Sequence, residues 1–366
     1  MKSRLLIPAL LLAACATLNA QSPATNSDPA SSESGPLQTR YSVSVIDDAT
    51  FYSDLRQPIP TVLNQVLVEP SFGLHYHDRL SFSTSLLGLA ATYSDNYSQL
   101  RVKETYVSLS AGDFDFAAGR KMVRWGTGYA FTAAGVLDPP RNPTDPGDRL
   151  NVNEGRDMVK ADYVRGPHAF SLAWSTAALA PANTTLHDTT AFRYNVLVHG
   201  FDTSLIAGHD RDSDSFGGFT FTRVVGQAWE LHGEGLWREQ AAALIGAKCT
   251  LHSGVTFIGE FFTPPNTAYY RDMSISPLAG RQHYAFFNAG KTRLRELPGW
   301  KEWDLSGSIV ANLNDHSFTG VLDVNRWFGN HFSSYLHMEI PHGAATSDYG
   351  SAPYSTATSV GVRFQL

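Results

Sequence analysis

The chain has 366 residues, a formal net charge of -6 and two cysteines. An acidic chain without a basic cluster gives no reason to expect nucleic acid as a partner, and a single cysteine beyond the N-terminal segment, Cys249, excludes an internal disulfide and a cysteine-based zinc site. Hydrophobic residues make up 43% of the chain, yet beyond the N-terminal segment no stretch approaches the roughly 20 apolar residues of a transmembrane helix.

The N-terminus has the three-part layout of a secretory signal peptide: two basic residues, an apolar run from Leu5 to Ala14, and small residues. We prefer cleavage after Ala20, and the alternative is cleavage before Cys15, where the sequence also has the form of a lipoprotein processing site. The segment predicts a signal peptide over residues 1–20, and the Ser/Pro-rich stretch after it predicts a disordered leader over residues 21–40.

From about Tyr41 onward the chain falls into segments of about 9 to 14 residues with a two-residue period, separated by clusters of Gly, Asn, Asp, Pro or Ser. Helical periodicity is almost absent. The pattern therefore predicts an all-β protein, either soluble or a membrane barrel whose strands are apolar on one side only.

The longest connection, residues 122–157, differs from the others in its charge. With the adjoining strand ends it carries six basic and five acidic side chains: Arg120, Lys121, Arg124, Arg141, Arg149 and Arg156, with Asp138, Asp145, Asp148, Glu154 and Asp157. Four prolines favour extended and turn conformations over a helix. A connection this long has to fold onto another part of the protein.

The later strands distinguish a membrane barrel from a soluble sheet. Between residues 229 and 238 one face carries Trp229, Leu231 and Trp237, and the other carries Glu230, His232, Glu234 and Arg238. The last segment sets Val360, Val362, Phe364 and Leu366 against polar residues. Glu and His on the supposed core side are unsuited to a soluble sandwich, so residues 41–366 are predicted to form a transmembrane antiparallel up-and-down β-barrel.

The lengths of the connections set the topology, because outer-membrane barrels alternate short periplasmic turns with longer external loops. Counted backwards from Leu366, short turns are expected near residues 329–330, 252–254, 226–227, 200, 166–167, 112 and 77–79, and longer loops near 341–355, 264–281, 179–188 and 122–157. This predicts about 18 strands, with 16 as the alternative, and both termini on the periplasmic side. A barrel of this size encloses an aqueous lumen unless something plugs it.

The charges of the long connection cannot face lipid, where an ionised residue at mid-depth costs about 2 to 4 kcal/mol. One interpretation is that the loop folds inward as a constriction, and the other is an external lid held together by its own ion pairs. The candidate constriction residues are Arg120, Arg124, Asp138, Arg141, Asp145, Asp148, Arg149, Glu154 and Arg156. Trp125, Gly126, Gly128 and Tyr129 are expected to shape the loop, since glycine lets the backbone turn sharply beside bulky rings.

One part of the sequence resembles a known group of proteins. A strand ending in Gly119-Arg120, then Arg124-Trp125-Gly126, then Asn142-Pro143 with Asp145, is similar to bacterial outer-membrane porin-like barrels of the alginate-export and related kinds. The resemblance is sharp over residues 119–159 and implies an outer-membrane channel, with Arg120, Arg124, Arg149 and Arg156 as the nearest pore-lining candidates. It does not supply the solute, because the sequence has no continuous basic ladder for a polyanion such as alginate.

The function predicted from the sequence is a passive channel for small hydrophilic solutes in the bacterial outer membrane. The expected partners are outer-membrane lipid, the barrel-assembly machinery and the solute. We expect no enzyme activity, no cofactor and no metal, since the sequence has neither a Gly-x-Ser-x-Gly elbow nor a complete calcium loop. The alternative is a closed barrel that acts as an outer-membrane enzyme or as a surface-polysaccharide or assembly partner.

Overall fold

The structure, a computed structural model, describes residues 37–77, 79–92, 96–178, 188–211, 215–264, 282–294 and 299–366. The predicted signal peptide and the predicted leader as far as residue 36 lie outside the described residues, as do most of the loops expected at 179–188 and 264–281. Residues Leu37–Leu366 form one compact unit.

The described part of this unit contains an 18-stranded sheet. Its strands are β1 (Leu37–Ser53), β2 (Val62–Tyr76), β3 (Leu80–Thr92), β4 (Asn96–Ala111), β5 (Phe114–Lys121), β6 (Arg156–Arg165), β7 (His168–Thr176), β8 (Thr189–Val198), β9 (Phe201–Asp210), β10 (Ser215–Val225), β11 (Trp229–Trp237), β12 (Ala241–Thr250), β13 (Val255–Thr263), β14 (Tyr284–Lys291), β15 (Trp303–Asn312), β16 (Ser317–Phe328), β17 (Phe332–His342) and β18 (Thr356–Gln365).

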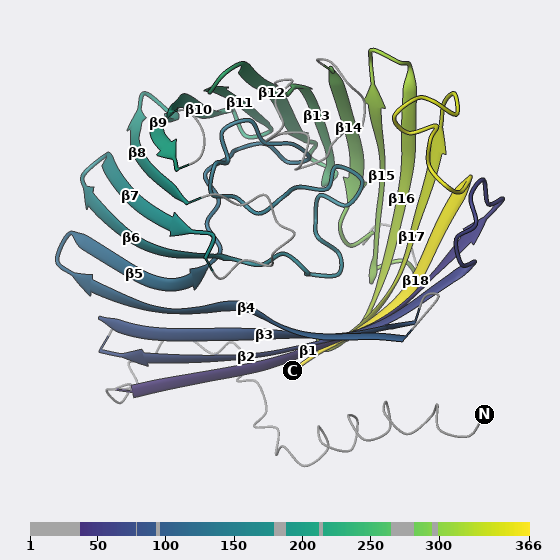
Figure 1. Cartoon of the computed structure of the whole chain (residues 1–366), viewed down its shortest axis with the longest axis horizontal. Coiled ribbons are helices and arrows are strands. Elements are labelled where there is room, and N and C mark those ends of the chain that lie inside the picture. The colour runs from purple at the N-terminus through teal and green to yellow at the C-terminus, as the bar shows by residue number, and fades with distance from the viewer. Residues whose placement is uncertain are drawn as a thin grey trace. The chain divides into compact units, whose positions relative to one another are not determined.

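Each strand pairs antiparallel with its neighbours in the sequence, and β1 pairs with β18 to close the barrel (Figure 1). The closing register runs from Ser44 opposite Gln365 to Ser53 opposite Thr356. This confirms the closed up-and-down topology and the count of 18 strands rather than 16.

The barrel begins earlier than the sequence suggested. Leu37 to Arg40 were assigned to the leader, but they pair with Tyr76 to Gly73 at the end of β2. β2 is 15 residues long, and the extension of β1 supplies hydrogen-bond partners for its last backbone groups.

Most of the predicted turns are hairpins of a few residues. Gly200, between β8 and β9, has a φ of 79°, and Gly329, between β16 and β17, has a φ of 74°. These left-handed conformations favour glycine, which is why the turns were visible in the sequence. No helix among the described residues is long and apolar enough to cross a membrane.

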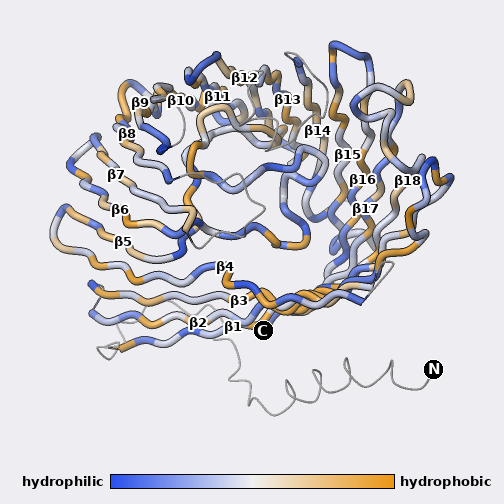
Figure 2. Tube along the Cα trace, in the orientation of Figure 1, coloured by the Kyte–Doolittle hydropathy of each residue, from blue (hydrophilic) through white to orange (hydrophobic). Residues whose placement is uncertain are grey.

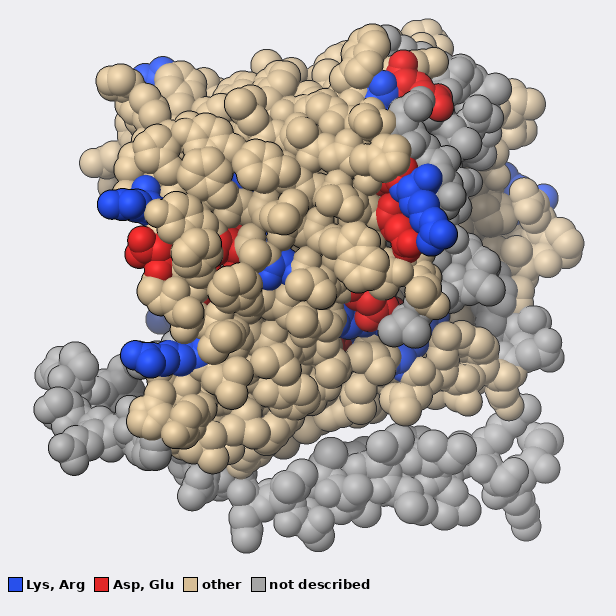
Figure 3. Space-filling model, turned by 60° about the vertical axis from the view of Figure 1, so that its left-hand side comes forward, with Lys and Arg blue, Asp and Glu red and all other residues tan. Residues whose placement is uncertain are grey.

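Hydrophilic and hydrophobic residues alternate along many of the strands (Figure 2). In β11, Trp229, Leu231 and Trp237 are exposed on the outer face, while His232 and Glu234 are buried on the inner one. The outer face turned to the viewer in Figure 3 is covered largely by uncharged residues. Such a surface suits a lipid environment, and the polar side chains of the same strands face the interior of the barrel.

Candidate functional site

The connection between β5 and β6 lies inside the ring of strands (Figure 1). It spans residues 122–155, because Arg156 and Asp157, which were assigned to it from the sequence, form the first pairs of β6. We call these residues the inner loop. A buried apolar cluster joins it to the wall, where Phe131 stacks on Phe262 of β13 with ring centroids 5.0 Å apart.

One attachment of the inner loop is the carboxylate of Glu234 on β11. Its Oε1 accepts the backbone N–H of Gly128 at 2.7 Å and that of Thr127, and its Oε2 accepts those of Ala133 at 2.7 Å and Ala134 at 2.8 Å. Glu234 is only 2% exposed. A carboxylate is expensive to bury unless donors surround it, and here the donors come from the loop backbone.

A second carboxylate, Glu260 on β13, holds the next residues of the loop. It accepts the N–H of Ala130 at 2.9 Å and of Phe131 at 3.3 Å, together with the N–H of Tyr129. The Nε2 atom of His232 lies 3.0 Å from the same carboxylate. Seven backbone N–H groups of residues 127–134 therefore point at two wall carboxylates.

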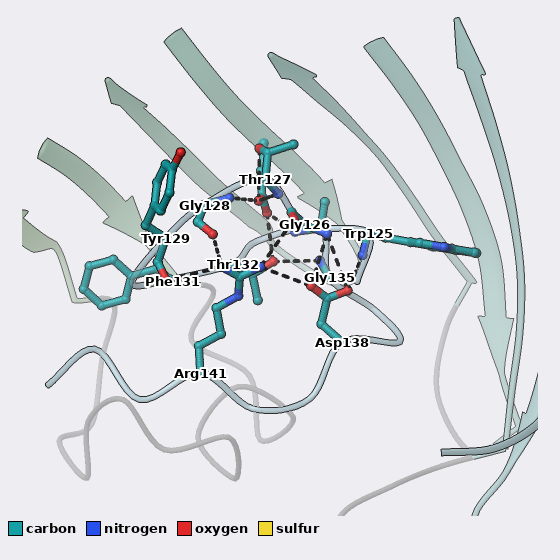
Figure 4. A network of polar contacts seen from close by, with 12 residues as sticks. Trp125, Gly126, Thr127, Gly128, Tyr129, Phe131, Thr132, Gly135, Asp138 and Arg141 are labelled. Carbon is teal, nitrogen blue, oxygen red and sulfur yellow. Dashed lines mark hydrogen bonds and ion pairs between the residues drawn. The ribbon is translucent and has the colours of Figure 1, made fainter. Parts of the chain in front are cut away.

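A third carboxylate, Asp138, closes the loop on itself (Figure 4). It accepts the N–H of Trp125 at 2.6 Å and of Gly126 at 3.2 Å, and Arg141 Nη2 lies 3.3 Å away. Burial raises the pKa of Asp138, although the backbone donors and Arg141 oppose that rise. The loop is thus held by its own ion pair as well as by the wall.

Gly126 and Gly128 lie where other atoms of the protein approach the loop backbone closely. Neither Gly126 nor Gly128 has a positive φ, so neither is needed for a left-handed backbone conformation. A Cβ at Gly126 would overlap Thr132 Oγ1, and one at Gly128 would overlap the carbonyl oxygen of Phe131. Glycine lets the loop backbone reach the wall carboxylates.

The far end of the inner loop is fastened to another part of the barrel. Arg149 Nη1 donates to Asp48 of β1 at 2.8 Å, and Asn151 Nδ2 donates to Glu69 of β2 at 2.6 Å. Leu150 packs against a small buried cluster that includes Leu67. The loop therefore crosses from the β11–β13 wall to the β1–β2 wall.

Inner-loop residues line two cavities, and a third cavity adjoins the second along the wall. One of about 250 Å³ is lined mainly by residues 138–153 of the loop, a second of about 440 Å³ lies between the loop and strands β13 to β18, and a third of about 320 Å³ follows β12 to β16. The first and second share Asp145, Pro146 and Arg149 as lining residues. The second and third share Ile258, Asn288, Ser306, Asp323 and Asn325. The three spaces are therefore neighbours along one side of the lumen.

The structure gathers six of the nine predicted charged residues at one place. The 250 Å³ cavity is lined by Arg124, Asp138, Arg141, Asp145, Asp148 and Arg149. Burial raises the pKa of Asp145, against the effect of its hydrogen bond from the N–H of Arg149.

The other three predicted residues line none of these three cavities. Arg120, near the end of β5, forms ion pairs with Asp157 at 2.7 Å and with Glu154 at 3.7 Å. Arg156 is buried at the start of β6. These arginines and Glu154 lie at the loop end of β5 and β6, beside Arg101 of β4.

Sequence reasoning missed the roles of Glu234 and Glu260. Glu234 had been placed on the polar face of its strand, but nothing in its local sequence indicates a partner more than 100 residues away. The available signal was a carboxylate at an inward position of a strand, where it needs donors from another element.

No model of a known protein family matches the chain, and no curated protein sequence matches it either. Solved structures share its fold. OccK11 (OpdR) of Pseudomonas aeruginosa matches with a TM-score of 0.62 at 10% identity, over 90% of this chain and 96% of that chain. A BenF-like porin of Pseudomonas fluorescens Pf-5 matches with a TM-score of 0.61 at 8% identity, over 91% and 99%.

A third match is OprD of Pseudomonas aeruginosa, with a TM-score of 0.60 at 10% identity, over 90% of this chain and 95% of that one. At these identities the likeness shows the fold, and it confirms the porin-like barrel predicted from the sequence. None of the three structures is described as an alginate exporter.

Proposed function

We propose that this protein is an outer-membrane channel that passes small hydrophilic solutes and that the inner loop narrows its lumen. The closed 18-stranded wall, its largely uncharged outer face and its polar interior support this function. The outer-membrane location, the periplasmic position of both termini and the insertion of the barrel by the assembly machinery belong to the same proposal. The similar structures include one described as a porin.

One observation carries the proposal: the inner loop is fastened to opposite walls and has cavities beside it. Between the Glu234 attachment and the Arg149–Asp48 ion pair, the loop spans the lumen without filling it. The segment that separates two cavities contains Asp145, Pro146 and Arg149. In our proposal this segment is the narrowest part of the channel, where fixed charge acts on a passing solute.

The first test is conductance in planar bilayers. The refolded protein should show discrete openings, and Arg149→Ala should shift permeability toward cations, because it leaves the carboxylates of Asp48 and Asp145 without their guanidinium partner. We expect the ratio of cation to anion permeability to rise about fivefold, which corresponds to a change of roughly 1 kcal/mol in the electrostatic energy of an ion at the cavity. Arg149→Lys should retain most of the selectivity.

Arg120→Ala is the matched control, since Arg120 also forms carboxylate pairs but lines none of the three cavities. An equal effect of the two alanine variants would contradict the constriction. A folded protein without any openings would contradict the channel and would favour the closed barrel that acts as an enzyme or an assembly partner.

A further inference from the structure

We infer that the path along strands β13 to β17 takes uncharged, hydroxyl-rich solutes of the monosaccharide or polyol class and disfavours ions of either sign. The inference rests on the proposed channel function and names its solute class. It comes from the balance of charge around the cavities and from the neutral polar groups that remain without partners.

Opposite charges are matched in number around the two cavities on this side. The 440 Å³ cavity is lined by Asp145 and Asp323 and by Arg149 and Arg363. The 320 Å³ cavity is lined by Asp304 and Asp323 and by Lys248 and Lys291. Neither cavity therefore presents a net charge that would attract one sign of ion.

Most of these charged side chains already form an ion pair or a hydrogen bond within the protein. Arg149 is paired with Asp48 at 2.8 Å, and the Asp323 carboxylate lies 2.6 Å from His337 Nδ1. The guanidinium of Arg363 donates to the backbone carbonyl of Arg149. An ion entering this space loses hydration and meets charged side chains that already have hydrogen-bond partners in the protein, which is unfavourable.

Neutral hydrogen-bonding groups are left over on the same wall. Ser306 and Ser308 on β15 and Ser333 on β17 line the 440 Å³ cavity, and their hydroxyls have no hydrogen bond to any described residue. Asn288 and Asn325 add side-chain amides. The hydrogen bonds that these amides donate within the protein are long, at 3.4 Å and 3.3 Å. Hydroxyls and amides both donate and accept, as the hydroxyls of a sugar do.

Apolar surface lies between these polar groups. Ile258, Phe286, Val324 and Leu336 line the same cavity, together with Tyr129 and Tyr335. A sugar ring has C–H faces as well as hydroxyl edges, so a wall that mixes apolar and neutral polar groups is complementary to both. An inorganic ion gains nothing from the apolar part.

The test compares solutes of one size and three charges in proteoliposomes: glucose, gluconate and glucosamine, with high symmetric salt to hold the membrane potential at zero. We expect glucose to enter about fivefold faster than either ion. A rate difference of this size is what the loss of one hydrogen bond typically causes. Preferred entry of gluconate or glucosamine through an open channel would overturn the solute class while leaving the channel function intact. Absence of entry by all three, and of conductance, would overturn the channel function itself.

The neutral groups are tested by the double variant Ser308→Ala and Ser333→Ala. It should lower glucose entry by about fivefold and leave the ionic conductance unchanged, because it removes hydroxyls and no charge. The control is Ser83→Ala on β3. Ser83 lies on the same face as the buried Ser85, and it lines neither cavity. Equal glucose entry in the double variant and the wild type would overturn the role assigned to these hydroxyls.

Discussion

The attachment of the inner loop to Glu234 gives the sharpest prediction. Glu234→Ala removes the acceptor of four backbone N–H groups, those of Thr127, Gly128, Ala133 and Ala134. A buried donor without an acceptor costs about 1 to 3 kcal/mol, so four of them would cost roughly 4 to 12 kcal/mol if the loop stayed in place. The loop avoids this cost by leaving the wall and bonding to water, and the lumen widens as a result.

Two measurements detect the release of the inner loop from the wall. Single-channel conductance should rise, and trypsin should cleave after Arg124 or Arg141 in the loop of the folded barrel. Glu234→Gln retains one acceptor oxygen, so its effects should fall between those of the wild type and the alanine variant.

Glu230→Ala is the matched control, because Glu230 lies on the same strand and contacts the inner loop through the hydroxyl of Tyr129, at 2.9 Å. The barrel itself should remain folded in every variant, as judged by heat-modifiable migration on gels. Wild-type conductance and wild-type protease resistance in a folded Glu234→Ala barrel would refute the reasoning.

Two further predictions concern the packing and the pH response of the loops. Gly128→Ala places a Cβ against the carbonyl of Phe131, so it should weaken the loop by about 1 to 3 kcal/mol, as overpacking typically does, and limited trypsin digestion should show faster loop cleavage than in the wild type. Burial alone would raise the pKa of Asp315, but hydrogen bonds from Ser317 and from the N–H of Asp348 outweigh it and hold the pKa below its ordinary value. This stabilisation is complete above the unfolded-state pKa and is lost as the pH falls through the lower folded-state pKa, so the melting temperature should fall in that acidic range, and Asp315→Asn should reduce the fall.

The sequence determined the wall of the barrel because the signals for it are local. A strand between lipid and lumen alternates with a period of two, and the hairpins carry glycines in left-handed conformations, as at Gly200 and Gly329. Counting these turns from Leu366 was sufficient for the correct strand number. The length and the unusual mixture of charges also marked residues 122–157 as a special loop, but the sequence left an inward constriction and an external lid as alternatives.

Local pattern was not sufficient at the ends of strands. Arg120 was grouped with the pore-lining candidates, and the structure pairs it with Asp157 on the next strand and places it in the lining of none of the three cavities. The surroundings of a residue beside a loop depend on where the strand ends, and pairing with the neighbouring strand sets that point, as it does for Arg156 and Asp157 at the start of β6.

Only the tertiary structure decided what holds the inner loop. Glu234 and Glu260 lie 100 or more residues from the N–H groups whose hydrogen bonds they accept, and Asp48 lies 101 residues from Arg149. These hydrogen bonds depend on how far the loop reaches across the lumen, and therefore on the closure and curvature of the barrel that the 18 strands form. Alternation along a strand shows that a carboxylate points inward, but the closed barrel determines which backbone it meets.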